Sequence, residues 1–265
     1  MDKQEILSLC NNLYEEAFDA KAARKILQQF RENVSNYREE FNCSPAFYGV
    51  VHQTLVQNML MLLSKLYDWN RNSLTLRTAL AETENINISD LDDHVSEMYS
   101  FSHHRFQHQL RPVEEPFYQK QVEDQKKLLE IFGYEYTHTT VDFELSEMHD
   151  LFQKRFQDLK DRGIIPNLIN RRNTIYAHND KKTNFDFDKV SDDYPLSMGD
   201  IDLLIDFAMD FLLFYIEILS GTYKAVEYIN IDDWANTLQM VRIGMKYKEA
   251  YIEEQLNEEW SDGSL

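Results

Sequence analysis

The stretch LLIDFAMDFLLFYIEIL, residues 203–219, is the most apolar in the chain and the strongest indicator of its fold. Projected on a helix at 100° per residue, the acidic residues of this stretch share a single stripe with Asp202, which directly precedes it. Apolar residues occupy the remaining surface. The stripe consists of Asp202, Asp206, Asp210 and Glu217. A membrane span would carry few or no charges, so the stretch predicts a buried core helix over 199–219, closed by Gly221.

Apolar residues also recur every seven positions near the N-terminus, which is typical of a helix that packs along one narrow seam. The repeat comprises Ile6, Leu13, Ala20, Leu27, Val34 and Phe41. It predicts one long helix from about residue 3 to 41, followed by a second helix that begins at Pro45.

Apolar periodicity and residues typical of helix ends predict the remaining helices. They are 73–82, a helix that opens at Ser89 and carries Phe106, and the ranges 117–132, 143–162, 166–178 and 234–260. The alternating residues 134–141 indicate a loop or one isolated strand, and a polar connection spans 180–198. The chain is therefore predicted to be an all-α bundle.

The composition agrees with a helical protein. Of 265 residues, 43% are hydrophobic, and only 7 Gly and 5 Pro are available for the turns of an all-β fold. The net charge of −19 argues against non-specific nucleic-acid binding and against an anionic membrane surface. Two isolated cysteines, Cys10 and Cys43, and an N-terminus without an apolar signal sequence predict a cytoplasmic protein with no membrane contact.

Against this acidic background, residues 151–182 form a basic segment with eight basic and three acidic residues. The basic residues are Lys154, Arg155, Lys160, Arg162, Arg171, Arg172, Lys181 and Lys182. An electropositive island inside an acidic surface would draw a phosphate group to one place. The alternative is that these charges are spread around a solvated helix.

Arg172 has an unusual place on the helix predicted over 166–178. Its neighbours on the same helical face are apolar, namely Ile165, Leu168, Ile169, Ile175 and Tyr176. A guanidinium among them is costly unless it has a partner. We therefore expect that Arg172 either pairs with a carboxylate or lines a cavity that holds an anion.

His178 follows Arg172 by about 9 Å along an ideal helix, a separation that a phosphodiester and long side chains can bridge. A histidine titrates near neutral pH and can transfer protons, and an arginine can stabilise the charge of a phosphorane. Together the two residues are sufficient for metal-free RNA cleavage. The alternative is a buried arginine paired with an aspartate, with an unrelated histidine on the surface.

The segment RNTIYAHND, residues 172–180, resembles the signature of HEPN domains, in which an arginine and a polar residue precede a histidine. A second segment, LLSKLYDWNRNSLTLRTAL at 62–80, resembles the abortive-infection U-type (AbiU-like) HEPN proteins of bacterial phage defence. The resemblance covers residues 45–190 approximately. It implies a helical bundle, a homodimer and a metal-independent endoribonuclease that acts in phage defence or as a toxin, without a cofactor. Such a toxin can be held inactive by a separate antitoxin protein.

Transferred to this sequence, the resemblance implies that Arg172 and His178 are catalytic and that Asn173 is their polar partner. Contacts to the RNA substrate are expected from their neighbours Arg171, Tyr176, Lys181 and Lys182. Some HEPN domains have lost catalysis. The alternative is therefore an inactive module that binds RNA, a nucleotide or a protein partner.

The same resemblance divides the chain into three segments within one structural unit. They are a long N-terminal helix (1–44), an HEPN-like bundle (45–222) and a C-terminal helix with an acidic tail (223–265).

Possible metal ligands form weaker patterns. On a helix, His104 and His108 would lie one turn apart with His94 and Glu97 on the same stripe, and this set could bind Zn²⁺. A polar helix face is the simpler interpretation. A second cluster of acids around His149 is more simply the first turn of a helix.

One arginine and one histidine supply a single proton-transfer group, whereas in-line cleavage benefits from both a base and an acid. A two-fold axis beside the 166–178 helix would bring the His178 of a second copy to the same phosphate. The apolar residues Leu168, Ile175 and Tyr176 would then belong to the dimer interface.

Overall fold

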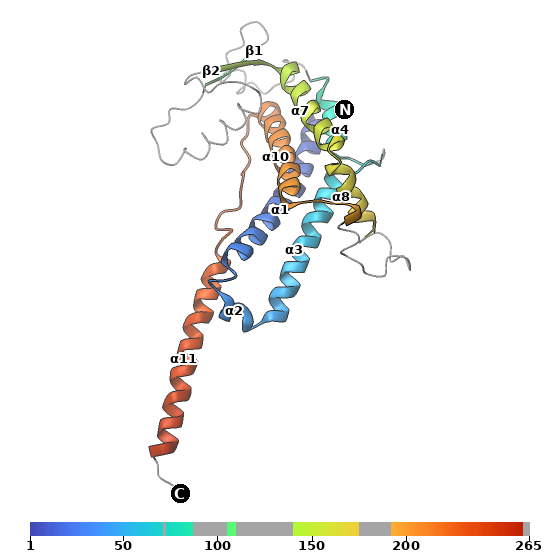
Figure 1. Cartoon of the computed structure of the whole chain (residues 1–265). Helices are drawn as coiled ribbons and strands as arrows, with labels where there is room; N and C mark the ends of the chain where they lie inside the picture. The colour runs from blue at the N-terminus through green and yellow to red at the C-terminus, as the bar shows by residue number, and fades with distance from the viewer. Residues whose placement is uncertain (71–72, 87–104, 110–139, 175–191, 262–265) are drawn as a thin grey trace. The chain divides into compact units, whose positions relative to one another are not determined.

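The computed structural model describes residues 1–70, 73–86, 105–109, 140–174 and 192–261 (Figure 1). Helices dominate this part of the chain, which confirms the predicted all-α class. One short pair of strands interrupts the helical pattern within the same residues. Among the described helices, none combines the length and apolar character that crossing a membrane requires.

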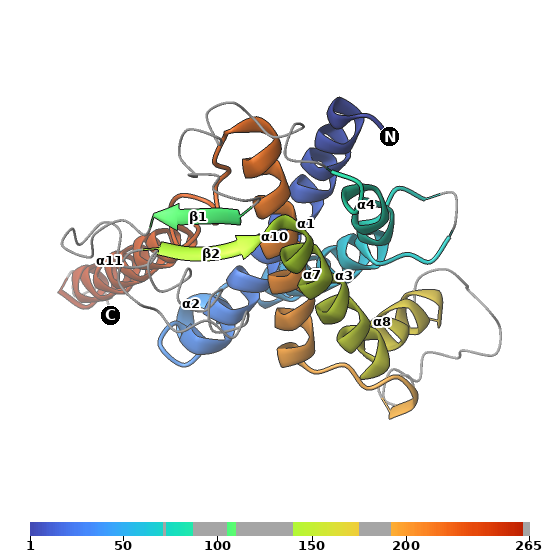
Figure 2. The ribbon, with the colours of Figure 1, turned by 90° about the horizontal axis from the view of Figure 1, so that it is seen from above.

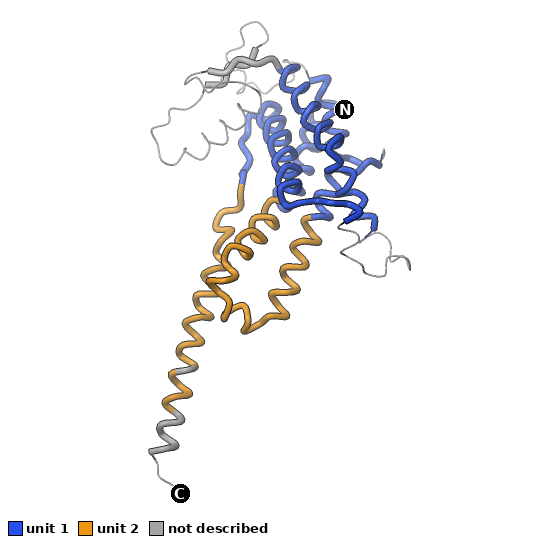
Figure 3. The backbone as a smooth tube through the Cα atoms, viewed as in Figure 1, with its two compact units in different colours: residues 1–20, 60–226 blue, residues 21–59, 227–265 orange. Residues whose placement is uncertain are grey.

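The chain forms two compact units (Figure 3). Unit 1 comprises residues 1–20 and 60–226, and unit 2 comprises residues 21–59 and 227–265. Two helices, α1 (Lys3–Asn33) and α3 (Pro45–Leu66), run from one unit into the other. The predicted division into 1–44, 45–222 and 223–265 stays a prediction.

Unit 1 is built around α10 (Met198–Ser220), which confirms the core helix expected from the sequence. Twelve of its residues are buried, among them Phe207 and Phe211, and Phe211 packs edge-on against Phe152 with ring centroids 5.4 Å apart. Ser197 begins the helix with a capping box that includes Asp200. Gly221 ends it in the left-handed conformation (φ 65°), which a residue without a Cβ adopts at little cost.

The other described helices of unit 1 are α4 (Leu76–Thr83), α7 (Leu145–Asp161) and α8 (Ile164–Arg172). The helix α7 packs against α10 and also lies beside α8, as the two ribbon views show (Figures 1 and 2). Two residues, Arg162 and Gly163, separate α7 from α8, and Gly163 takes the left-handed conformation (φ 77°). It allows α8 to begin at Ile164, two residues before the start that the sequence predicted at Pro166.

Leu168 lies in the core of unit 1 and is completely buried within one copy of the chain, as is Ile165. The expectation that Leu168 belongs to a dimer interface is therefore wrong. The reason is that α8 already buries this face within its own subunit. The other two residues expected there, Ile175 and Tyr176, lie outside the described residues.

The N-terminal helix is shorter than its heptad pattern predicted. The helix α1 ends at Asn33, a turn follows at 34–37, and a separate short helix, α2 (Arg38–Asn42), continues the chain. Asn33, Ser35 and Asn36 favour turns because their side chains compete for backbone hydrogen bonds. Val34, which the repeat placed on the buried seam, is 53% exposed.

Unit 2 contains the end of α1, α2, most of α3 and the last helix, α11 (Trp234–Ser261). Trp234 packs edge-on against Phe30 with ring centroids 4.7 Å apart, and its Nε1 donates a hydrogen bond to Gln29 at 2.7 Å. Arg242 on α11 pairs with the buried carboxylate of Glu40. These contacts hold α11 against α1 and α2.

The strands β1 (Arg105–Gln109) and β2 (Thr140–Glu144) pair in antiparallel register, with Arg105 opposite Glu144. The helix predicted to carry Phe106 is therefore wrong at that position, because the backbone here is extended. Residues 140–141 of the stretch expected to be a loop or strand do form part of β2. The remainder of that stretch and the predicted helix 117–132 lie outside the described residues.

Candidate functional site

Arg172 is the last residue of α8, and its side chain lies beside the turn that follows α3. Its Nη1 donates to Oδ2 of Asp68 at 3.3 Å, and the two side chains are only 20% and 24% exposed. Asn173 is the next residue, and Oδ1 of its amide accepts from Nε at 3.1 Å and from Nη2 at 3.0 Å. Arg172 and Asn173, both predicted site residues, are thus in direct contact.

The contacts of Arg172 leave part of its donor fork available. A guanidinium carries five N–H donors, and three of them bind Asn173 and Asp68. Within the described part of the chain, the other two donors, one on Nη1 and one on Nη2, make no hydrogen bond. Two terminal donors of this kind match two oxygens of a phosphate group.

Asp68 remains ionised at this site. Burial acts to raise the pKa of its carboxyl, but hydrogen bonds from Arg172 and from the backbone N–H groups of Asn70 and Trp69 outweigh it. The pKa of Asp68 consequently lies below its ordinary value. An aspartate that is charged across the neutral range holds the Arg172 side chain in one orientation.

This arrangement meets one of the two expectations for Arg172, and binding of an anion stays a prediction. The arginine has a carboxylate partner, as the alternative interpretation predicted. The partner, Asp68, belongs to the turn at residues 66–68 (Leu-Tyr-Asp) within segment 62–80. The two segments of the family resemblance therefore meet in unit 1. Asp68 was not among the predicted site residues, and only its place in that turn pointed to it.

The other predicted site residues have different outcomes. Nε of Arg171 donates to the backbone carbonyl of Tyr194 at 2.6 Å, which ties the end of α8 to the segment before α10. Tyr176, His178, Lys181 and Lys182 lie outside the described residues. Their roles stay predictions.

The basic segment 151–182 is less positive in three dimensions than in sequence. Arg155 pairs with Asp210 of α10 at 2.8 Å and lies over the ring of Phe207 at 5.6 Å. Arg162 pairs with Asp158 at 3.4 Å. Among the described basic residues of the segment, Arg155, Arg162 and Arg172 thus have carboxylate partners, and the partners of Arg155 and Arg172 lie outside the segment.

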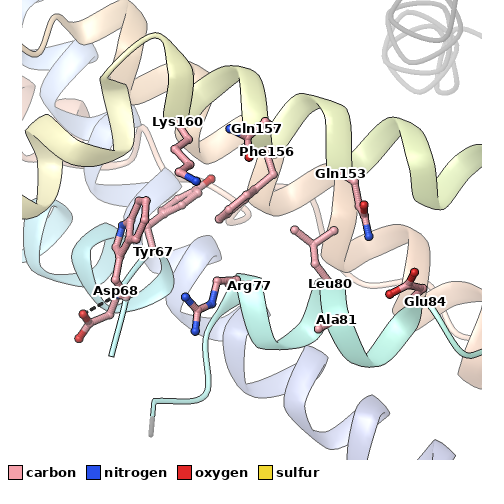
Figure 4. Close-up of a pocket in the computed structure, with 11 residues that line it drawn as sticks. Tyr67, Asp68, Arg77, Leu80, Ala81, Glu84, Gln153, Phe156, Gln157 and Lys160 are labelled. Atoms are coloured by element: carbon pink, nitrogen blue, oxygen red, sulfur yellow. Dashed lines mark hydrogen bonds between the residues drawn. The ribbon is translucent and has the colours of Figure 1, made fainter. Parts of the chain in front are cut away.

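A cleft of about 310 Å³ opens beside the Arg172–Asp68 pair, between α7 on one side and α4 with the turn after α3 on the other (Figure 4). Asp68 belongs to both the pair and the cleft. The residues that line it are Tyr67, Asp68, Trp69, Arg77, Leu80, Ala81, Glu84, Gln153, Phe156, Gln157 and Lys160. Sequence reasoning counted Lys160 in the basic segment but predicted no cleft.

His149 is 6% exposed and lies behind one end of this cleft. Its Nδ1 lies 3.2 Å from the hydroxyl of Tyr215, and its Nε2 lies 2.8 Å from Nε2 of Gln153. Burial lowers the pKa of His149, although the charges of Glu84 and Asp150 oppose this effect. Among the described residues, no group of three possible metal ligands occurs.

The weaker zinc pattern is only partly visible. His94, Glu97 and His104 lie outside the described residues, and the backbone of His108 belongs to β1. The helix expected to carry both His104 and His108 is therefore absent at His108, and the zinc set itself stays a prediction. A strand rises about 3.3 Å per residue, so residues that are neighbours on a helix become widely separated.

Comparison with known families now adds to the geometry. The sequence model of the AbiU2 HEPN family matches residues 3–237. The chain belongs to the AbiU2 family of HEPN domains. The match includes Asp68, Arg172 and the whole of unit 1 beyond its first residues, and it extends well beyond the 45–190 range of the predicted resemblance.

AbiU2 is an abortive-infection family of HEPN domains, so the family recognised from segments 62–80 and 172–180 is confirmed. No curated protein and no solved structure matches this chain. The AbiU2 match covers α1 and the beginning of α11 together with the bundle.

Proposed function

We propose that this AbiU2-family protein is a metal-independent endoribonuclease of phage defence or a toxin, with Arg172 and His178 as its catalytic residues. HEPN domains are typically ribonucleases, and Arg172, which the resemblance assigns to the HEPN signature, is the last residue of α8. The observation that carries the proposal is the position of the Arg172 guanidinium. Asp68 and Asn173 fix this group by hydrogen bonds, and two of its terminal N–H donors stay available beside a cleft.

The proposed reaction is an intramolecular transfer at phosphorus. Neutral His178 removes the proton of a ribose 2′-hydroxyl, and the 2′-oxygen attacks the adjacent phosphorus. The bond from phosphorus to the 5′-oxygen breaks, and that oxygen leaves with a proton from an acid, for which the His178 of a second copy is the candidate. The products are a 2′,3′-cyclic phosphate and a 5′-hydroxyl.

In this scheme Arg172 stabilises the negative charge that builds up on the non-bridging oxygens of the phosphorane. Asp68 and Asn173 fix the guanidinium before the substrate arrives, so little reorganisation is needed during the reaction. Asp68 also offsets part of the positive charge of Arg172. The donor geometry of Arg172 therefore matters in addition to its charge.

The test is cleavage of a mixed-sequence, single-stranded RNA in the presence of EDTA. We expect cutting that leaves 2′,3′-cyclic phosphate ends, and its loss in Arg172→Ala and His178→Ala. Arg172→Lys keeps the charge but removes the fork, and we expect a loss of roughly 100-fold or more. Circular dichroism and urea unfolding confirm that each variant is folded.

Matched controls come from exposed residues of the same types. Arg162 follows the end of α7 and pairs only with Asp158 in the described structure, and His52 lies on the exposed side of α3. Arg162→Ala and His52→Ala should cut RNA at the wild-type rate. Cleavage that requires Mg²⁺ or Zn²⁺, or that survives Arg172→Ala in a folded protein, would overturn the proposal.

A second candidate is a catalytically inactive HEPN module that binds RNA, a nucleotide or a protein partner. The observation that favours it is the ion pair of Arg172 with Asp68, which also serves simply to stabilise a half-buried arginine. Such a module would bind RNA without cutting it, and Arg172→Ala would lower its stability rather than any activity.

A further inference from the structure

The cleft beside Arg172 has the chemical lining of a nucleotide site. At one end Asp68, Lys160 and Arg77 bring charged groups together, and Figure 4 shows Arg77 from α4 and Lys160 from α7 directed toward the space between these helices. Gln153 and Glu84 lie at the other end. One end thus offers cations for a phosphate, and the other offers polar groups for hydrogen bonds.

Aromatic side chains form the wall between these ends. Tyr67 is fully buried and stacks on Phe156 with ring centroids 6.1 Å apart and an angle of 14°. Its hydroxyl donates to the carbonyl of Leu204 at 2.6 Å, which anchors the wall to α10. Trp69 is 39% exposed, and the ammonium of Lys160 lies 5.2 Å from its ring. An exposed indole beside this anchored wall is a surface on which an unpaired nucleobase can stack.

Gln153 presents a defined hydrogen-bonding edge to the cleft. Its Nε2 lies 2.8 Å from Nε2 of the buried His149, and the neutral imidazole accepts there while its Nδ1–H donates to Tyr215. This contact uses one N–H of the amide. Gln153 lines the cleft, and its amide retains a carbonyl acceptor and a second N–H donor, the pair of groups with which an amide recognises a base edge.

We propose that this cleft binds one nucleotide of the RNA strand next to the scissile phosphate. The base stacks on Trp69 and contacts Phe156, the edge of the base meets Gln153, and Lys160 with Arg77 binds the neighbouring phosphate. The proposal rests on the proposed function, because Asp68 joins the cleft to Arg172. It assigns to the cleft the selection of which phosphate reaches the catalytic arginine.

The size of the cleft limits its ligand to a single nucleotide. Its volume of 310 Å³ lies at the low end of small-molecule pockets, roughly 300–1,000 Å³. A base pair or an RNA duplex does not fit such a space, so the strand must be unpaired here. A free nucleotide shares the same chemistry, and the experiment below separates the two sources.

The experiment measures binding without cutting. A short single-stranded RNA with 2′-O-methyl groups cannot be cleaved by the proposed reaction, and fluorescence anisotropy of its labelled form gives a Kd for the full-length protein. We expect Trp69→Leu and Lys160→Gln to raise this Kd on the order of tenfold each. Trp69→Phe keeps an aromatic surface and should restore most of the binding.

Matched controls lie on the same helix and at another exposed aromatic residue. Lys154→Gln removes an exposed cation of α7 that does not line the cleft, and Tyr247→Leu removes a ring that is 74% exposed on α11. Both should leave the Kd unchanged. Adenosine and uridine monophosphates serve as competitors, and weak competition at millimolar concentration supports an RNA strand as the source of the nucleotide.

The outcomes distinguish this inference from the proposed function. If wild-type protein cuts RNA but Trp69→Leu and Lys160→Gln bind and cut like wild type, the nucleotide site is refuted and the ribonuclease stands. If no RNA is cut but both variants weaken binding, the site stands and the ribonuclease is refuted. Tight binding of a free mononucleotide, at micromolar concentration, would overturn the assignment to an RNA strand.

Discussion

Arg172 and Asp68 are 104 positions apart in the chain, and their side chains form an ion pair at 3.3 Å. Arg172 is the last residue of α8, and Asp68 lies in the turn that follows α3. The pair joins the two segments that resemble AbiU-like proteins most closely. It also places an ionised aspartate between Arg172, the proposed catalytic residue, and the cleft.

Asp68→Asn should lower the free energy of unfolding by about 1–2 kcal/mol, because a partly buried guanidinium loses a charge-assisted hydrogen bond. Urea unfolding measures the change. Asp158→Asn is the matched control, since its partner Arg162 is 48% exposed and such surface pairs contribute little. Equal effects of the two substitutions would mean that the Arg172–Asp68 pair is no stronger than a surface contact.

The burial of His149 should make stability depend on pH. The pKa of His149 in the folded protein is lowered, so the unfolded chain takes up a proton first, near pH 6.5. The stability from neutral His149 is therefore fully present above about pH 6.5 and is lost as the pH falls through the folded-state pKa. Glu84, Asp150 and Tyr215 are the titratable groups that face it.

His149→Gln removes this titration and keeps a polar side chain. Its unfolding free energy should fall less steeply than that of the wild type between pH 7 and pH 5, as measured by urea unfolding at each pH. Parallel curves for the two proteins would show that His149 is not a buried neutral histidine.

Leu168→Ala should destabilise a single copy of the chain by roughly 2–5 kcal/mol, because it leaves a cavity in the core of unit 1. Leu203 on α10 is 38% exposed, and Leu203→Ala is expected to cost less than about 1 kcal/mol. If Leu168→Ala instead weakened self-association at unchanged unfolding free energy, Leu168 would belong to an interface after all.

If the site is shared between two copies, an inactive subunit should lower the activity of the wild-type subunit with which it pairs. When wild-type protein is mixed with an excess of His178→Ala and the subunits exchange, most wild-type chains enter mixed dimers with one histidine at each phosphate. Activity per wild-type chain should then fall well below that of wild type alone, in the EDTA cleavage assay. Activity in proportion to the wild-type fraction would show that each chain carries a complete site.

The sequence was most informative where a single segment contains both the apolar pattern of a buried helix and the residues that mark its two ends. In α10, the acids Asp206 and Asp210 mark the outer stripe, and Ser197 and Gly221 mark the ends, so the helix was predicted within one residue at each end. The heptad repeat failed at 34–37 because periodicity reports burial over a long window. It does not register a short run of turn-forming residues.

The partner of Arg172 shows the limit of sequence reasoning. Apolar neighbours such as Leu168 predicted that the arginine needs a partner, but the partner is 104 residues away and no local pattern connects them. The cleft was missed for the same reason, since Trp69 follows α3 while Gln153 and Lys160 belong to α7, and these elements meet only in the fold. Family resemblance marked both segments without saying that they touch.

Gly163 directly precedes α8, so its backbone conformation sets the direction in which α8 runs. The helix has 9 residues, so Arg172 lies about 13 Å from this joint, and a tilt of ten degrees there would shift the guanidinium by about 2 Å. A misplacement of only 1 Å can slow a reaction about 100-fold. Lys160 stays with α7 on the other side of the joint. A residue with a Cβ at position 163, strained at φ 77°, would therefore leave the proposed nucleotide cleft unchanged and shift the proposed catalytic arginine.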